Sequence, residues 1–205
     1  MNARGVATLH VLRVRGPLVT ARVAEATGED EAVVTGLLAE LDASGFVGPR
    51  GQPPRWALKD AGRVAHHDAM ASELAACADP HAVRGAYDRF LLVNPDLLAT
   101  VTAWQLRLGA DGTETLNDHT DRRYDRMVID QLGAVHRDVI PVVDALTAML
   151  ERFASYGRRL SAAYERVRRG DREWFTSPTR DSYDRVWFEL HEDLLVTLGV
   201  ERRRT

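Results

Sequence analysis

The 205-residue sequence contains a single cysteine, Cys77. One thiol excludes an internal disulfide and a cysteine-rich zinc site, and it is typical of a protein that folds in a reducing compartment. The apolar runs are too short to span a bilayer, and the N-terminus lacks the order of charged, apolar and small residues that marks a signal peptide. These absences predict a cytoplasmic protein in which Cys77 is a small buried apolar residue.

Motifs of catalytic or metal chemistry are also missing from the sequence. It has no Gly-x-Ser-x-Gly, no glycine-rich phosphate loop and no His-x-x-x-His. His119, His136 and His191 fall on three expected helices that could converge, but their spacing is not that of a metal site. We therefore expect a protein that is not an enzyme and that holds neither a metal nor a cofactor.

The charge balance alone does not indicate that the protein binds nucleic acid. The formal net charge is −3; residues 1–66 carry eight Arg or Lys against seven acids, and the rest of the chain carries nineteen against twenty-three. Neither half is strongly basic, so any DNA-binding surface has to come from a local arrangement of cations.

The first 66 residues predict three short helices followed by a hairpin. The helices are expected over 5–14, 18–27 and 30–44, each ended by a glycine: Gly16, Gly28 and Gly45. The third helix carries an apolar stripe that we expect to face inward, made of Val33, Val34, Leu37, Leu38 and Leu41. Extended residues 46–47 and 55–58 flank the Pro/Gly-rich turn 48–54, which completes the pattern of a winged helix.

The same segment resembles the MarR-like winged-helix transcriptional regulators. The family's helix-to-wing pattern is matched by Leu38, Leu41, Gly45, Phe46 and Val47, and its closing strand and helix entry by Trp56, Leu58, Gly62 and Arg63. Lys59 stands where the family usually has threonine. The resemblance implies a regulator that binds DNA as a dimer.

The third helix is unusual for a DNA reader because its ionisable side chains, and those just before it, are all acidic. They are Glu29, Asp30, Glu31, Glu40 and Asp42. Its outward face offers chiefly Thr35 for base contacts, so we expect DNA contacts at Thr35 and at the wing cations Arg50, Arg55 and Lys59. The alternative is a winged helix that docks a protein, its acidic helix meeting a basic partner.

Residues 67–79 are expected to form a linking helix, and residues 80–205 an all-helical bundle for dimerisation and ligand binding. Helices are predicted over 80–93, 95–108, from about 117 to the residue before Pro141, over 142–169 and over 179–198, with a loop at 109–112. In the linking helix, residues at three- and four-residue steps fit either a short dimer seam or packing on the second half of the chain. They are His67, Met70, Leu74 and Cys77.

Aromatic residues of the bundle are candidates for an effector site. Trp104, Trp187 and His191 are expected to line a cavity between helices, where a small-molecule effector would bind. Aromatic residues at helical spacing are more often part of the core, so core packing is the competing interpretation.

The helical half also has a looser likeness to known proteins. Residues 87–94, Trp104-Gln105-Leu106 and residues 183–191 resemble a helical segment appended to some pyruvate phosphate dikinase-related proteins. The phosphohistidine and phosphoenolpyruvate-binding motifs of those enzymes are absent from this sequence. This likeness implies a stand-alone accessory or sensing module linked to phosphoenolpyruvate-utilising enzymes.

Overall fold

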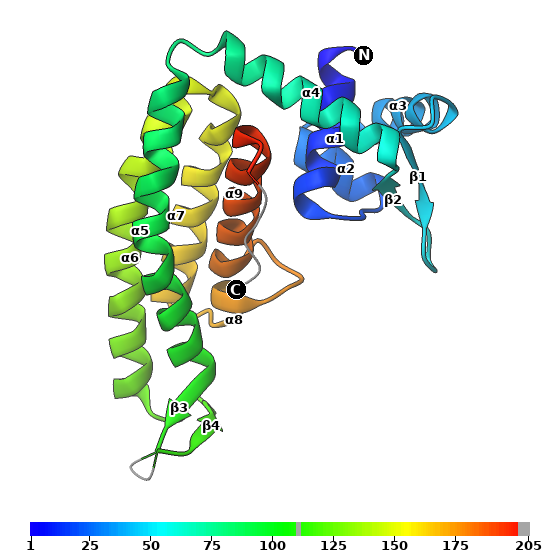
Figure 1. Ribbon diagram of the computed structural model, residues 1–205. Helices are drawn as coiled ribbons and strands as arrows, with labels where there is room; N and C mark the ends of the chain where they lie inside the picture. Colours follow the sequence, from blue (N-terminus) through cyan, green and yellow to red (C-terminus); the bar gives the residue numbers. More distant parts are fainter. Residues whose placement is uncertain (110–111, 201–205) are drawn as a thin grey trace. The chain divides into compact units, whose positions relative to one another are not determined.

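The computed structural model describes residues 1–109 and 112–200, and the chain divides into two compact units. Unit 1 comprises Met1–Ala76 together with the chain from Glu192 onward, and unit 2 comprises Cys77–His191. Both units are mainly helical (Figure 1). Within the described residues, no helix is long and apolar enough to cross a membrane.

Unit 1 begins with three helices and a hairpin, in the order that the sequence predicts. The elements are α1 (Ala3–Arg15), α2 (Thr20–Thr27), α3 (Glu31–Ala43), β1 (Val47–Arg50), β2 (Arg55–Leu58) and α4 (Asp60–Ala76). The two strands are antiparallel, with Val47 opposite Leu58 and Arg50 opposite Arg55. A bridge between Leu18 and Trp56 ties the α1–α2 connection to the outer edge of the hairpin.

The glycines at the ends of α2 and α3 set the helix boundaries. Gly28 has a left-handed backbone with φ of 72°, and its N–H donates to the carbonyl of Ala24 at 2.9 Å. Gly45, with φ of 77°, turns the chain from α3 into β1. Side chains with a Cβ rarely adopt this conformation, which explains why both predicted boundaries are found where glycine stands.

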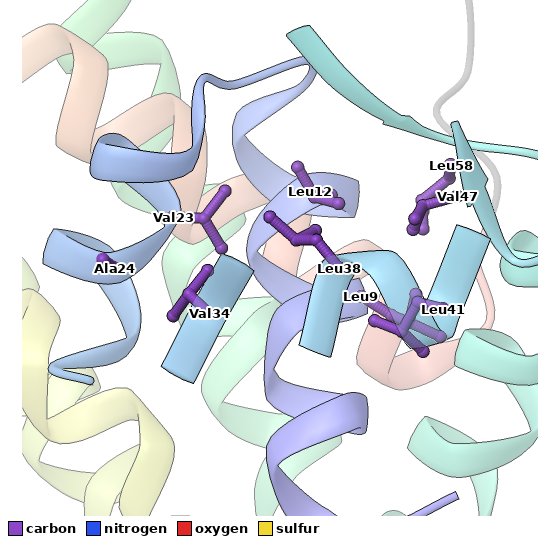
Figure 2. Packing of buried hydrophobic residues seen from close by; sticks show 9 residues of the cluster. All are labelled: Leu9, Leu12, Val23, Ala24, Val34, Leu38, Leu41, Val47 and Leu58. Carbon is purple, nitrogen blue, oxygen red and sulfur yellow. The ribbon is translucent and has the colours of Figure 1, made fainter. Parts of the chain in front are cut away.

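The core of unit 1 is a cluster of nine buried apolar residues contributed by the three helices and the hairpin (Figure 2). They are Leu9, Leu12, Val23, Ala24, Val34, Leu38, Leu41, Val47 and Leu58. From α3, Val34, Leu38 and Leu41 follow one helical stripe, and Leu37 packs beside it. Val33 is 40% exposed, so the expectation that it faces inward is wrong; at about 100° per residue it falls beside the stripe rather than on it.

The expected boundary after residue 66 lies inside a continuous helix. α4 runs from Asp60 to Ala76, so residues 67–76 extend the same helix instead of forming a separate linker. Within the single chain Met70 is only 3% exposed, whereas His67 is exposed. Cys77 is half-buried rather than buried, with its Sγ 3.7 Å from the carbonyl of Met149. The burial of Met70 favours packing on the chain itself over a dimer seam.

Unit 2 is formed by long helices and a small hairpin. Its elements are α5 (Pro80–Gln105), β3 (Leu106–Leu108), β4 (Glu114–Leu116), α6 (Arg122–Met149), the 3-10 turn η1 (Glu151–Phe153), α7 (Ala154–Arg168), α8 (Glu173–Thr176) and the first half of α9 (Tyr183–Leu198). Helices α5, α6 and α7 lie side by side (Figure 1). The hairpin means that the second half is not all-helical as expected; Ala110 and Asp111 of the predicted loop lie outside the described residues.

Two prolines were expected to separate helices and do not. Pro95 lies inside α5 and Pro141 lies inside α6. The predicted N-cap residue Asn94 has another role, because its side-chain oxygen accepts a hydrogen bond from Trp187 Nε1 at 2.9 Å. An interior proline removes one backbone hydrogen bond, a cost that packing along a long helix can exceed.

The break in the chain comes later than the sequence suggests. The predicted helix 142–169 is divided at Leu150, which is extended (φ −138°, ψ 101°) and only 6% exposed. Burial continues across this break, because Phe153, Tyr156 and Leu160 are also buried. The prediction of one continuous helix over 142–169 therefore missed the turn between α6 and α7.

A half-buried histidine makes the stability of unit 2 dependent on pH. His136 stacks on Tyr164 with ring centroids 4.6 Å apart, and its Nδ1 lies 3.3 Å from the hydroxyl of Tyr183. Burial lowers the pKa of His136 below its ordinary value of 6.5, and the charge of Glu165 opposes this only in part. The unfolded chain therefore binds a proton at a higher pH than the folded chain does.

We expect the free energy of unfolding to be highest above pH 6.5 and to fall as the pH drops through the pKa of the unfolded histidine. Urea unfolding at a series of pH values measures this, and His136→Phe should flatten the part of the profile that begins near pH 6.5. A profile that rises on acidification, or one that His136→Phe leaves unchanged, contradicts the assignment.

Candidate functional site

The outward face of α3 carries side chains that are mostly small, apolar or acidic. Exposed residues there are Ala32, Val33, Thr35, Gly36, Ala39 and Glu40. The hydroxyl of Thr35 donates to the carbonyl of Glu31, one turn earlier, at 2.7 Å. Thr35 thus lies on the surface as expected, but its hydroxyl proton is already donated within the helix. The sequence has no Arg or Lys between Arg22 and Arg50, so α3 itself carries no cation.

Most cations near α3 are paired with its acids or with those of neighbouring elements. Lys59 Nζ lies 2.7 Å from Asp42 Oδ1, and Arg4 Nε lies 2.9 Å from Glu29 Oε1. Both pairs are partly exposed, so each adds little stability, but each lowers the positive charge offered to a polyanion. Lys59 is therefore placed beside the wing as predicted, with its charge largely balanced by Asp42.

The wing presents an exposed pair of cations. Arg50 ends β1 and Arg55 begins β2, directly across the hairpin register, and both side chains are exposed. The cross-strand arrangement keeps the two side chains next to each other at the base of the Pro/Gly turn. The sequence-predicted set is thus divided into an exposed arginine pair on the wing, a neutralised Lys59, and Thr35 on an acidic helix.

The hairpin carrying this pair is held to the helices by tryptophan. Trp56 exchanges two backbone hydrogen bonds with Leu18, at 3.1 and 2.7 Å, and its indole Nε1 donates to Thr20 Oγ1 at 3.1 Å. Leu58 and Val47 anchor the inner end of the hairpin in the core. The wing is therefore fixed at its base, while its tip with Arg50 and Arg55 lies at the surface.

The three residues expected to line a ligand cavity do not form one site. Trp187 and His191 both contact Phe90, with ring centroids 4.8 and 5.1 Å apart, and Trp187 is only 3% exposed. Trp104 contacts His119 and Phe175 instead, at 4.3 and 4.9 Å. Along α5 it lies ten residues beyond Asn94, the partner of Trp187, or about 15 Å at the helical rise.

Trp187 is thus packed in the aromatic core, and the half-buried His191 lies against the same Phe90 ring. Trp104 differs, because it contributes to the wall of a pocket that opens between α6 and the α7–α8 turn. Trp104 has nine companions in that pocket, and four of them are arginines: Arg122, Arg126, Arg168 and Arg172.

A second feature missed by sequence reasoning is a chain of hydrogen-bonded side chains in unit 1. His10 Nδ1 lies 3.1 Å from His66 Nε2, and His10 Nε2 lies 3.1 Å from Asp193 Oδ2. His66 and Asp193 are almost fully buried, and Thr197 Oγ1 donates to the second carboxylate oxygen at 3.2 Å. With Arg13 paired to Glu192, this chain connects α1 and α4 to the last turns of α9.

The histidines offer no metal centre in the part of the chain that the structure describes, where no group of three or more His, Cys, Asp and Glu side chains is placed to hold an ion. His119, His136 and His191 lie in separate surroundings, beside Asp125, Tyr183 and Phe90 respectively. The comparisons with known proteins add no relative: no family model matches the chain, and neither curated proteins nor solved structures show significant similarity to it.

Proposed function

We propose that the chain is a cytoplasmic winged-helix transcriptional regulator that binds DNA as a dimer and grips it through the wing rather than through α3. Three helices with a shared core, a hairpin at the end of α3 and the Leu18–Trp56 bridge support a winged helix. The exposed pair Arg50 and Arg55 is the observation that carries the DNA contact.

A protein that binds DNA in this way is expected to discriminate only weakly between DNA sequences. Arginines contact phosphates and can enter the minor groove, which distinguishes bases poorly. The face of α3 has no side chain suited to reading guanine or adenine apart from Thr35, whose hydroxyl is engaged by Glu31. A dimer doubles the number of contacts between wing arginines and DNA. Because each wing offers only two arginines, we expect measurable DNA binding to require the dimer.

The wing arginines are tested by fluorescence anisotropy with a labelled random-sequence duplex at low salt. Arg55→Ala should weaken binding by about tenfold or more, because a dimer loses two phosphate contacts. Thr35→Ala is the matched control on α3 and should change the affinity by less than about twofold, since its hydroxyl bonds to its own helix. The opposite ranking of the two variants would assign base reading to α3 and overturn the wing proposal.

The structure also favours a second candidate, a winged helix that docks a basic protein. The observation behind it is the exposed face of α3, where Ala32, Val33 and Gly36 are flanked by Glu31 and Glu40. Small apolar residues let another chain approach closely, and the acids favour a cationic partner. Failure of the wild-type protein to bind DNA at low salt would replace the first function by this one.

A further inference from the structure

A pocket of about 440 Å³ lies in unit 2, at the beginning of α6. Its walls come from three parts of the chain: the first turns of α6, the end of α7 with the following turn, and the end of α5. The lining residues used below are Trp104, Arg122, Asp125, Arg126, Arg168 and Arg172. This volume is within the range of sites that hold small molecules.

The four arginines of the pocket are available to a ligand to different degrees. Arg122 and Arg126 are exposed one turn apart on α6, and neither side chain makes a hydrogen bond or an ion pair in the part of the chain that the structure describes. Arg168 is paired with Glu165 at 3.1 Å, an exposed pair that contributes little and is easily exchanged. Arg172 donates to the carbonyl of His119 at 3.0 Å, which places its guanidinium at the pocket.

One carboxylate of the pocket, that of Asp125, is already compensated. Asp125 is buried, and its Oδ1 lies 3.1 Å from Asn117 Nδ2 and 3.0 Å from His119 Nδ1, while Arg172 Nη2 lies 3.6 Å from its Oδ2. Asp125 therefore acts as an anchor that orients its neighbours. Asp130 is the second carboxylate of the pocket, which leaves arginines in excess of acids by two.

His119 shows that this corner of unit 2 is held in a defined shape. Its backbone is left-handed, with φ of 60°, a conformation that costs a residue other than glycine about 1 kcal/mol or more. The contacts with Asp125, Arg172 and the ring of Trp104 fix it there. Such strain is found where the surrounding structure positions groups for binding.

The dipole of α6 adds to the positive character of the pocket. Asp121 caps the helix by accepting from the N–H groups of Arg123 and Tyr124, and the pocket residues Arg122, Asp125 and Arg126 occupy the first turns. The N-terminal end of a helix carries a partial positive charge that favours anions within about one turn. Apolar contributions from Trp104, Ile129 and Val167 make the remaining wall suitable for a short carbon skeleton.

We propose that this pocket binds a small dianion, a molecule with two carboxylate groups or a phosphate group on a short apolar skeleton. Guanidinium groups form paired, charge-assisted hydrogen bonds with either anionic group. The binding stands on unit 2 alone; a role for this ligand as the effector of DNA binding rests on the proposed function. The two properties are measured separately, so that either can fail without the other.

The test is an NMR titration of the full chain labelled with ¹⁵N-tryptophan, using inorganic phosphate and succinate as probes at constant ionic strength. The indole signal of Trp104 should shift and saturate with at least one probe, and the probe with the lower Kd identifies the ligand class. Arg126→Gln and Arg122→Gln should each raise this Kd by about tenfold, the usual effect of losing one hydrogen bond to a charged group. Both side chains are exposed, so neither variant is expected to disturb folding.

Arg137→Gln is the matched control, since it changes an exposed arginine of the same helix outside the pocket. It should leave the Kd unchanged. The proposal is overturned if neither probe shifts the Trp104 signal, if chloride gives the same shift, or if Arg137→Gln weakens binding as much as Arg126→Gln. A response that persists in the Arg122→Gln/Arg126→Gln double variant would equally place the ligand elsewhere.

Discussion

Replacing Gly62 by alanine should destabilise unit 1 by about 3 kcal/mol or more, the range of severe core and backbone clashes. A Cβ at this position would lie 2.0 Å from the carbonyl oxygen of Phe46 and 2.9 Å from its carbonyl carbon. These are backbone atoms, so no side chain can turn aside, and α4 would have to move away from the α3–β1 connection. The effect is measured by urea unfolding followed by circular dichroism.

Gly36→Ala is the matched control for Gly62→Ala. Gly36 lies in the exposed middle of α3, and a Cβ there would meet nothing within 4 Å. Alanine should therefore stabilise the protein by about 0.5–1 kcal/mol, because it reduces the freedom of the unfolded chain and favours helix. If Gly62→Ala is as well tolerated as Gly36→Ala, the packing of α4 against residue 46 is described wrongly.

Arg159→Ala should be the most damaging single change in unit 2, costing about 3–5 kcal/mol as expected for a broken buried ion pair. Its guanidinium lies 2.8 and 2.9 Å from the two carboxylate oxygens of Asp181 and 2.6 Å from Glu189 Oε2. Burial acts to lower the pKa of Arg159, but the bond to Asp181 and the charges of Glu189 and Asp181 outweigh it, so its pKa lies above the ordinary value. Alanine would remove a charged partner of Glu189, which is 2% exposed and is also paired with Arg185 at 3.2 Å.

The neighbouring Arg158 provides the control for this prediction. It belongs to the same helix but is exposed and makes no ion pair among the described residues. Arg158→Ala should change the free energy of unfolding by less than about 0.5 kcal/mol, as for most surface substitutions. Arg159→Lys should recover part of the loss by restoring the charge without the paired geometry. Equal effects of Arg158→Ala and Arg159→Ala would show that the network contributes no stability.

The two adjacent arginines illustrate what a single sequence can predict. Nothing local distinguishes Arg158 from Arg159, because the difference arises from Asp181 and Glu189, which come more than twenty residues later. The same limit applies to the arginine pocket, whose walls are separated by more than sixty residues of chain. Long-range partners are invisible to periodicity and spacing.

Local signals were reliable where the chain itself determines the conformation. Gly28 and Gly45 end their helices because of their left-handed backbone, and the turn before Arg55 is supplied by glycine and proline. The Asn94-Pro95 signal failed for a physical reason: the bond from Trp187 and the packing of α5 outweigh a local preference to start a new helix. Prediction was thus best in unit 1, where short elements and turns dominate.

The central claim is that any grip on DNA comes from the wing and not from α3. It is tested most directly by the slope of log Kobs against log salt concentration for wild-type protein and for the Arg50→Ala/Arg55→Ala double variant. Removing four phosphate contacts from a dimer should make the slope shallower by about 3.6, at about 0.9 per contact. A double variant that binds DNA with the wild-type slope would contradict the claim.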